Sequence, residues 1–156
     1  MELNLYRFQS TWGIDAKQAD VYSILEAVDH YPEWWPEVRA ADRLAADRYR
    51  MQIRSFLPYD LVFVGTQWER DPQTGILSIH MKGDLEGFSR WTIVPRDHET
   101  TVTFDEQVTV TKPILRRLAV VGRPAFQWNH ALMMRHCRAG LRACLAGIHL
   151  ERSEGD

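Results

Sequence analysis

The hydrophobic pattern of the chain changes its period once, near Lys112-Pro113, and this change limits the folds that the chain can adopt. From Val38 to Thr111, apolar and polar residues alternate in short runs, which is the period of β-strands. From Pro124 to Ile148, apolar residues recur at the spacing of an α-helix. Successive strands followed by one long helix favour an α+β domain in which helices cover one side of an antiparallel sheet.

Turn signals divide the middle region into six strands. The clearest is Asp71-Pro72-Gln73-Thr74-Gly75, because its residue types favour tight turns. Further turns are expected at residues 45–47, 57–60, 83–84 and 95–98. The spacing of these turns predicts an antiparallel meander.

The region before the meander predicts one strand and two short helices. Leu3 to Trp12 alternates as a half-buried strand, and Ala16 to Val28 carries an amphipathic stripe. Asp15, followed three positions later by Gln18, resembles a capping box at the start of this helix. In the next stretch, HYPEWWPE at residues 30–37, two prolines limit the backbone to one short helical turn. With the six later strands, the expected sheet has seven strands.

Length and composition favour one domain over residues 1–150, followed by a flexible tail at 151–156. The chain has 156 residues, of which 45% are hydrophobic and 26% charged, enough to build a sizeable core. A net charge of -2 gives no general attraction to nucleic acid. No apolar run approaches the ~20 residues that span a bilayer, and the N-terminus lacks signal-peptide features, so a cytoplasmic location is expected.

The residues that commonly bind metals are not arranged in a metal-binding pattern. Cys137 and Cys144 would lie about 10 Å apart along a helix, too far for a disulfide, so buried free thiols are expected. The six histidines show no HxxxH spacing and the cysteines no CxxC spacing. We therefore assign no metal site and no cofactor.

The last strand of the meander places a carboxylate on its apolar face. In residues 101–111, Glu106 shares a face with Phe104 and Val108, while the other face is polar. A charged, unpaired carboxylate in this position would cost several kcal/mol, so it needs a partner or a raised pKa. The alternative is a β-bulge or strand end that lets Glu106 reach water.

The long helix has an inner face with small and polar residues. Steps of about 100° per residue bring the following residues to this face: Phe126, Asn129, His130, Met133, Cys137, Gly140, Leu141, Cys144 and Ile148. Gly140 and the cysteines make this wall recede where a filled core would more often have leucine. Either an internal cavity or a close contact between the helix and the sheet explains this recess. His130 is either a catalytic group or a buried, satisfied histidine.

One strand is apolar on both faces. In Leu61 to Trp68, Val62, Val64 and Trp68 alternate with Leu61, Phe63 and Gly65. A homodimer would cover the outer stripe, and a packed loop would explain it equally well.

Four segments together resemble the START-like superfamily, in the branch called polyketide cyclase/dehydrase and lipid transport. They are IDAKQADVYSILEAVDHYPEWWPEV, LPYDL, GDLEGFSRWTIVP and TKPILRRLAVVGRPAFQWNHALMMRHCRAGLRA, and they cover nearly the whole chain. The resemblance implies a helix-grip fold, in which a curved seven-stranded sheet wraps around the C-terminal helix and encloses an apolar cavity. Members of this superfamily include aromatase/cyclases, lipid and quinone carriers and hormone receptors.

The resemblance also places the short turn with two tryptophans near the mouth of the cavity. We expect one of Trp34 and Trp35 to pack into the core and the other, Trp35, to face the cavity, although both could simply fill one end of the core. The residues expected to contact a ligand are Trp34, Trp35, Tyr59, Phe63, Trp91, Phe104, Glu106, Asn129, His130, Met133 and Cys137.

The leading functional hypothesis is the binding of a hydrophobic small molecule, such as a lipid, a quinone or a polyketide-like compound. The first alternative is a polyketide aromatase/cyclase or dehydratase in which Glu106, His130 and Arg90 transfer protons. Arg90 is the weakest of these candidates, since it alternates with Trp91 and Ile93, whose face is expected to point inward. The second alternative is a structural or partner-binding module with a filled core.

Overall fold

The computed structural model describes residues 4–54, 59–113 and 119–155. Its strands are β1 (Leu5–Ile14), β2 (Val38–Ala45), β3 (Arg48–Ile53), β4 (Leu61–Asp71), β5 (Ile76–Gly83), β6 (Leu85–Arg96) and β7 (Glu99–Val110). The helices are α1 (Gln18–Glu26), the 3-10 helix η1 (Val28–Glu33) and α3 (Ala119–Glu154). The predicted α+β order of one strand, two short helices, six strands and a long helix is confirmed.

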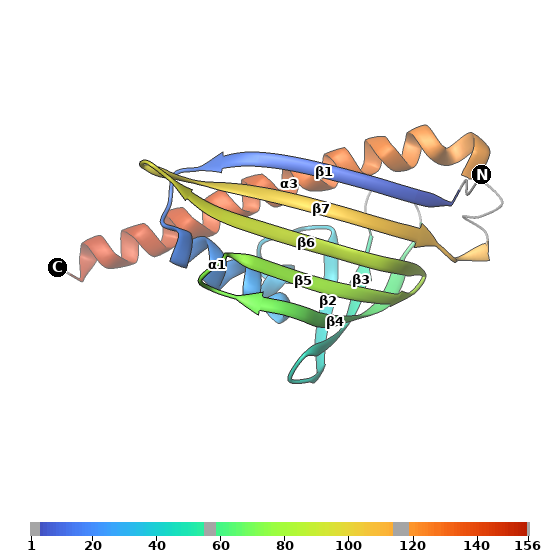
Figure 1. Ribbon diagram of the computed structural model, residues 1–156, viewed down its shortest axis with the longest axis horizontal. Coiled ribbons are helices and arrows are strands. Elements are labelled where there is room, and N and C mark those ends of the chain that lie inside the picture. Colours follow the sequence, from blue (N-terminus) through green and yellow to red (C-terminus); the bar gives the residue numbers. More distant parts are fainter. Residues whose placement is uncertain (1–3, 55–58, 114–118, 156) are drawn as a thin grey trace.

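The seven strands form one antiparallel sheet in the order β1-β7-β6-β5-β4-β3-β2. The six later strands form the expected meander, and β1 pairs with the last of them, β7. Figure 1 shows β2 and β3 running at a steep angle to β5 and β6. This change of direction along the sheet shows that the sheet is strongly curved. The long helix α3 runs along the concave side (Figure 1), as in a helix-grip fold.

The register of β7 fixes what surrounds Glu106. On one side Glu106 pairs with Phe8 of β1, and on the other it pairs with Ser89 of β6. Because paired residues in an antiparallel sheet point to the same face, Phe8 and Ser89 share the face of Glu106. Val102, Phe104, Val108 and Val110, on the same face, are all buried. The predicted inward face of this strand is therefore present, without a bulge at Glu106.

Two local predictions needed correction. The expected capping box does not form, since the N-cap of α1 is Lys17 and no side chain caps the helix. Gln18 instead donates its amide hydrogen to the carbonyl oxygen of Ile93, at 2.7 Å, and so joins α1 to β6. Helix α3 also extends beyond the expected 124–148 at both ends and includes residues 151–154 of the expected tail. The turn expected at 57–60 lies partly outside the described residues.

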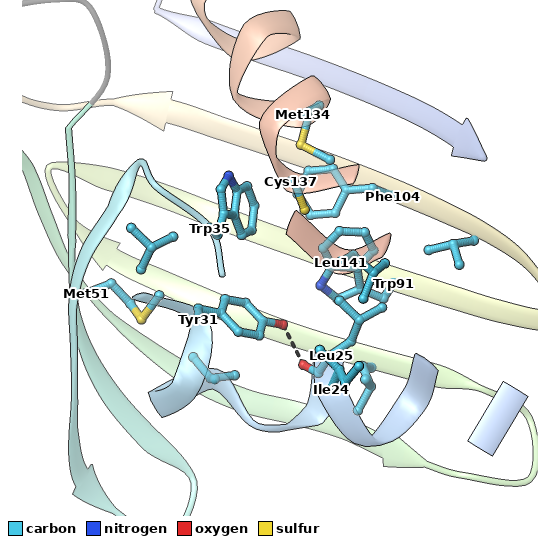
Figure 2. Packing of buried hydrophobic residues seen from close by; sticks show 14 of the residues in the cluster. Ile24, Leu25, Tyr31, Trp35, Met51, Trp91, Phe104, Met134, Cys137 and Leu141 are labelled. Atoms are coloured by element: carbon cyan, nitrogen blue, oxygen red, sulfur yellow. Dashed lines mark hydrogen bonds between the residues drawn. The ribbon is translucent and has the colours of Figure 1, made fainter. Parts of the chain in front are cut away.

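The core lies between α3, the turn around η1 and the concave face of the sheet. Figure 2 shows Met134, Cys137 and Leu141 on α3 pointing toward Phe104 and Trp91 of the sheet. Within the described ranges, no helix is long and apolar enough to cross a membrane.

Candidate functional site

Two partly open cavities lie between the sheet and α3. Their volumes are about 80 Å³ and about 90 Å³. Six residues line both cavities: Trp35, Ile53, Phe63, Met81, Phe104 and Glu106. We call these six residues the junction, and the two cavities the inner chamber (about 80 Å³) and the outer chamber (about 90 Å³). Because the two chambers have the junction residues as a common wall, we treat them together as one candidate lumen.

Each chamber has its own set of further lining residues. The inner chamber is lined by Leu25, Val28, Tyr31, Val38, Met51, Gln67, Glu69, Leu77, Ser78, Ile79, Ser89 and Trp91. The outer chamber is lined by Tyr6, Phe8, Leu61, Leu85, Val108, Val110, Phe126, Asn129, His130 and Met133. Most of these side chains are apolar, as expected for a small-molecule pocket that holds few polar groups.

Aromatic rings form much of the wall beside the junction. The ring centroids of Trp91 and Phe104 lie 4.6 Å apart, and those of Trp35 and Trp91 lie 6.5 Å apart. These separations are typical of favourable tilted or edge-to-face contacts between aromatic rings. The contacts join β6, β7 and the turn after η1, so the wall is built from segments far apart in the sequence.

Glu106 is the one charged residue of the junction, and it faces His130 of α3. The Oε1 atom of Glu106 lies 3.5 Å from Nε2 of His130. About 14% of the Glu106 side chain and about 13% of the His130 side chain are exposed. The distance is longer than a normal N–H···O hydrogen bond but allows an ion pair when the imidazole is protonated. An acid and a base from the sheet and the helix therefore meet at the lumen.

The orientation of His130 is fixed by aromatic rings on its flanks. Its imidazole stacks on Phe8 with ring centroids 3.7 Å apart and planes 5° from parallel. It is also nearly parallel to Phe104, at 6.1 Å. Both phenylalanines come from strands that neighbour each other, β1 and β7, so the sheet holds the imidazole edge toward Glu106.

The turn after η1 is attached to α3 through Trp35. The indole Nε1 of Trp35 donates to the carbonyl oxygen of Met133 at 3.1 Å, while its ring lines both chambers. Trp34 lines neither chamber. Its ring stacks on that of Trp35, and its backbone carbonyl lies against Gly140 of α3.

Tyr31 supports this turn from the inner chamber. Figure 2 shows its hydroxyl pointing to Leu25 at the end of α1, where it donates to the Leu25 carbonyl oxygen at 2.5 Å. Burial raises the pKa of Tyr31 far above its ordinary value, so the phenol stays protonated. The hydroxyl therefore acts as a structural hydrogen-bond donor.

The structure brings most of the predicted ligand residues to the lumen. Those that line it are Trp35, Phe63, Trp91, Phe104, Glu106, Asn129, His130 and Met133. Trp34, Tyr59 and Cys137 line neither chamber. Cys137 is fully buried, and burial with the nearby Glu37 carboxylate raises the pKa of its thiol.

Arg90 lies on the opposite face of the sheet from Trp91. Its side chain is exposed and forms an ion pair with Glu69 at 3.0 Å, and its guanidinium also lies near the ring of Phe88. Since Trp91 and Ile93 of the same strand are buried, alternation turns Arg90 to the opposite face of the sheet. Arg90 itself lines neither chamber, although its ion-pair partner Glu69 lines the inner one.

Sequence reasoning missed several lumen residues. Those not predicted include Tyr6, Phe8, Tyr31, Met51, Ile53, Gln67, Met81 and Ser89. Alternation with Trp91 could have placed Ser89 inward, and alternation within the first strand could have grouped Tyr6 with Phe8. The contact between buried Glu37 and His136 of α3 was also missed, because residues 99 positions apart carry no shared sequence signal.

The curved sheet wrapped around the long helix, with a lumen between them, defines a helix-grip fold. The sequence model of the family described as polyketide cyclase/dehydrase and lipid transport matches residues 6–143. The chain belongs to this family. No curated protein matches the sequence significantly.

Solved structures support the same fold. A protein from Thermus thermophilus is similar with a TM-score of 0.80 and 16% identity, over 92% of this chain and 99% of that one. A START superfamily protein from Mycobacterium smegmatis has a TM-score of 0.70 and 18% identity, over 91% and 98%. The Zhui aromatase/cyclase from a Streptomyces species has a TM-score of 0.66 and 13% identity, over 92% and 93%. At these identities the likeness establishes the fold.

Proposed function

We propose that the protein binds a hydrophobic small molecule in the lumen between the sheet and α3. The observation that carries this proposal is a pair of largely apolar chambers that share a junction, of which Trp35 is part. A filled core would leave no such volume, because protein interiors normally pack as densely as organic crystals. The family includes lipid transport in its description, which agrees with a binding role.

The volumes limit the size of a ligand that fits without rearrangement. An apolar cavity of about 150 Å³ accommodates a benzene ring. Each chamber, at about 80 or 90 Å³, is smaller, so a ring-sized ligand has to occupy both. Met51, Met81 and Met133 line the walls, and flexible methionine side chains can adapt to a larger lipid, quinone or polyketide-like molecule.

Toluene tests this proposal, because its single ring matches the combined volume. We expect saturable binding with one site per chain, measured by isothermal titration calorimetry. Ile79→Phe fills the inner chamber and Val108→Phe the outer one, and each should weaken binding by about tenfold or more, since the ring needs both volumes.

The control is Val64→Phe, which adds the same volume as Val108→Phe at a position that alternates with inward Phe63 on β4. This variant should bind toluene as the unchanged protein does. Absence of saturable binding to the unchanged protein would refute the proposal. Equal binding by all three variants would show that toluene binds elsewhere.

A second candidate function is catalysis by a polyketide cyclase or dehydratase, and the Glu106–His130 pair favours it. The 3.5 Å separation puts an acid and a base within reach of one bound molecule, directly or through one water. Native mass spectrometry of the purified protein can identify a co-purifying molecule to use as ligand or substrate. For an enzyme, Glu106→Gln should abolish turnover and retain affinity, whereas for a carrier it should change affinity or stability alone.

A further inference from the structure

The junction between the two chambers contains one hydrogen-bonding group among five apolar residues. Five of the junction residues have apolar side chains: Trp35, Ile53, Phe63, Met81 and Phe104. The one polar group among them, the indole N–H of Trp35, donates to the Met133 carbonyl oxygen. Glu106 is the sixth residue. A molecule that extends through both chambers therefore passes beside a carboxylate at its middle.

Glu106 has acceptor capacity left for such a molecule. An ionised carboxylate offers about four lone-pair sites on two oxygens. Among the residues that the structure describes, its contact is with His130, at 3.5 Å, outside normal hydrogen-bond range. About 14% of the Glu106 side chain is exposed. A donor on the bound molecule would add a hydrogen bond to this carboxylate.

The neighbouring imidazole favours a neutral donor over a cation. Because Nε2 of His130 lies 3.5 Å from the carboxylate, an ammonium group at the junction would have to share that carboxylate with the imidazole. A hydroxyl donates a hydrogen bond without adding charge. The rings of Phe8 and Phe104 hold the imidazole in place, so it cannot easily turn away from the junction.

We propose that the ligand is an elongated neutral alcohol, with its hydroxyl near the middle of the molecule and one apolar arm in each chamber. The hydroxyl donates to the Glu106 carboxylate. This inference rests on the proposed binding function and adds the class of ligand and its orientation. It explains why one of the two carboxylates that line the lumen, Glu106, lies where the chambers meet.

Two isomers separate this inference from general apolar binding. Heptan-4-ol carries its hydroxyl at the centre of the chain, and heptan-1-ol carries it at one end, with the same number of carbons. We expect the unchanged protein to bind heptan-4-ol about tenfold more tightly than heptan-1-ol, because only the central hydroxyl can donate a hydrogen bond to the Glu106 carboxylate. Chemical shifts of the indole N–H signals of Trp35 and Trp91, followed by NMR during titration, report the affinity.

Glu106→Leu should reduce the preference between the isomers to about twofold or less, since leucine has no acceptor. The matched control is Asp105→Asn, which removes the neighbouring carboxylate of β7 and should leave the preference intact. Asp105 points to the other face of the sheet and accepts a hydrogen bond from Gln9. The comparison of isomers on the unchanged protein stands even if Glu106→Leu fails to fold.

The outcomes distinguish the two proposals. If toluene binds but the isomers bind equally, or if Glu106→Leu keeps the preference, the central-alcohol inference is wrong and the binding function stands. If protonated heptan-4-amine binds more tightly than heptan-4-ol, the ligand is a cation and the inference is overturned. If neither toluene nor either alcohol binds, both proposals fall.

Discussion

Gly140 and Gly147 lie on the same helix, two turns apart, in different surroundings. A Cβ atom at Gly140 would lie 1.8 Å from the carbonyl oxygen of Trp34, whereas one at Gly147 would meet nothing within 4 Å. The recess that the sequence predicts at Gly140 is therefore filled by the backbone of the tryptophan turn, and the lumen lies elsewhere. The close contact at Gly140 is therefore made with this turn, and not with the sheet as the sequence alternative had it.

The two glycines give a matched pair of substitutions. Gly140→Ala should lower the free energy of unfolding by about 1–3 kcal/mol, because the backbone of the turn has to shift. Gly147→Ala should raise it by about 0.5–1 kcal/mol, since alanine favours a helix more than glycine does. Urea unfolding followed by circular dichroism measures both, and equal effects of the two changes would contradict the contact.

Tyr31 allows a prediction about alkaline pH. Tyr31→Phe leaves the buried Leu25 carbonyl without its donor and should cost about 1–3 kcal/mol at neutral pH. Burial raises the pKa of Tyr31, so above about pH 10 the unfolded chain releases this proton while the folded protein keeps it. The contribution of Tyr31 to stability is thus present below pH 10 and falls above it.

The difference in stability between the unchanged protein and Tyr31→Phe should accordingly shrink between pH 9 and pH 11, since the variant lacks the titrating phenol. Urea unfolding of both proteins across this range provides the measurement. A difference that stays constant or grows with pH would show that Tyr31 is not held protonated by burial.

At the scale of elements, α3 presents its two cysteines differently. Cys137 is fully buried against the sheet, and Cys144 is partly exposed. Burial and the Glu37 carboxylate raise the pKa of the Cys137 thiol, which lowers the fraction of reactive thiolate. The docking of α3 therefore protects one thiol more than the other.

We expect Cys144 to react with Ellman's reagent at pH 8 about tenfold or more faster than Cys137, which reacts only when α3 opens. Cys137→Ser and Cys144→Ser isolate each thiol. Mild urea should accelerate Cys137 more than Cys144. Similar rates for both thiols in the folded protein would contradict the docking of α3.

The elements themselves were largely predictable, because each depends on a local pattern. Alternation on β7 placed Glu106 inward correctly, and the prolines limited residues 30–37 to a short turn. Contacts between distant elements were less predictable. The stacking of His130 on Phe8 depends on the pairing of β1 with β7. The close contact of Gly140 with the Trp34 backbone depends on where α3 crosses the turn.

At the scale of the whole molecule, the order of strands and helices fixed the fold class, and the resemblance to START-like proteins fixed the helix-grip arrangement. The volume of the lumen could not be predicted. It depends on the curvature of the sheet and on how far Trp35 and the junction side chains fill the space, and these quantities have no counterpart in a one-dimensional pattern. The same limit applies to Arg90. Alternation along β6 predicts that its side chain points outward, but its ion pair with Glu69 depends on how β4, β5 and β6 are aligned.

The central claim is that an apolar lumen lies between the sheet and α3 and accepts a small molecule. A crystal of the protein under xenon pressure tests it most directly, because xenon enters dry apolar cavities. We predict xenon at the junction, in contact with Trp35, Phe63 and Phe104. Xenon confined to the protein surface, with the junction closed by side chains or occupied by ordered water, would contradict the lumen and the function proposed for it.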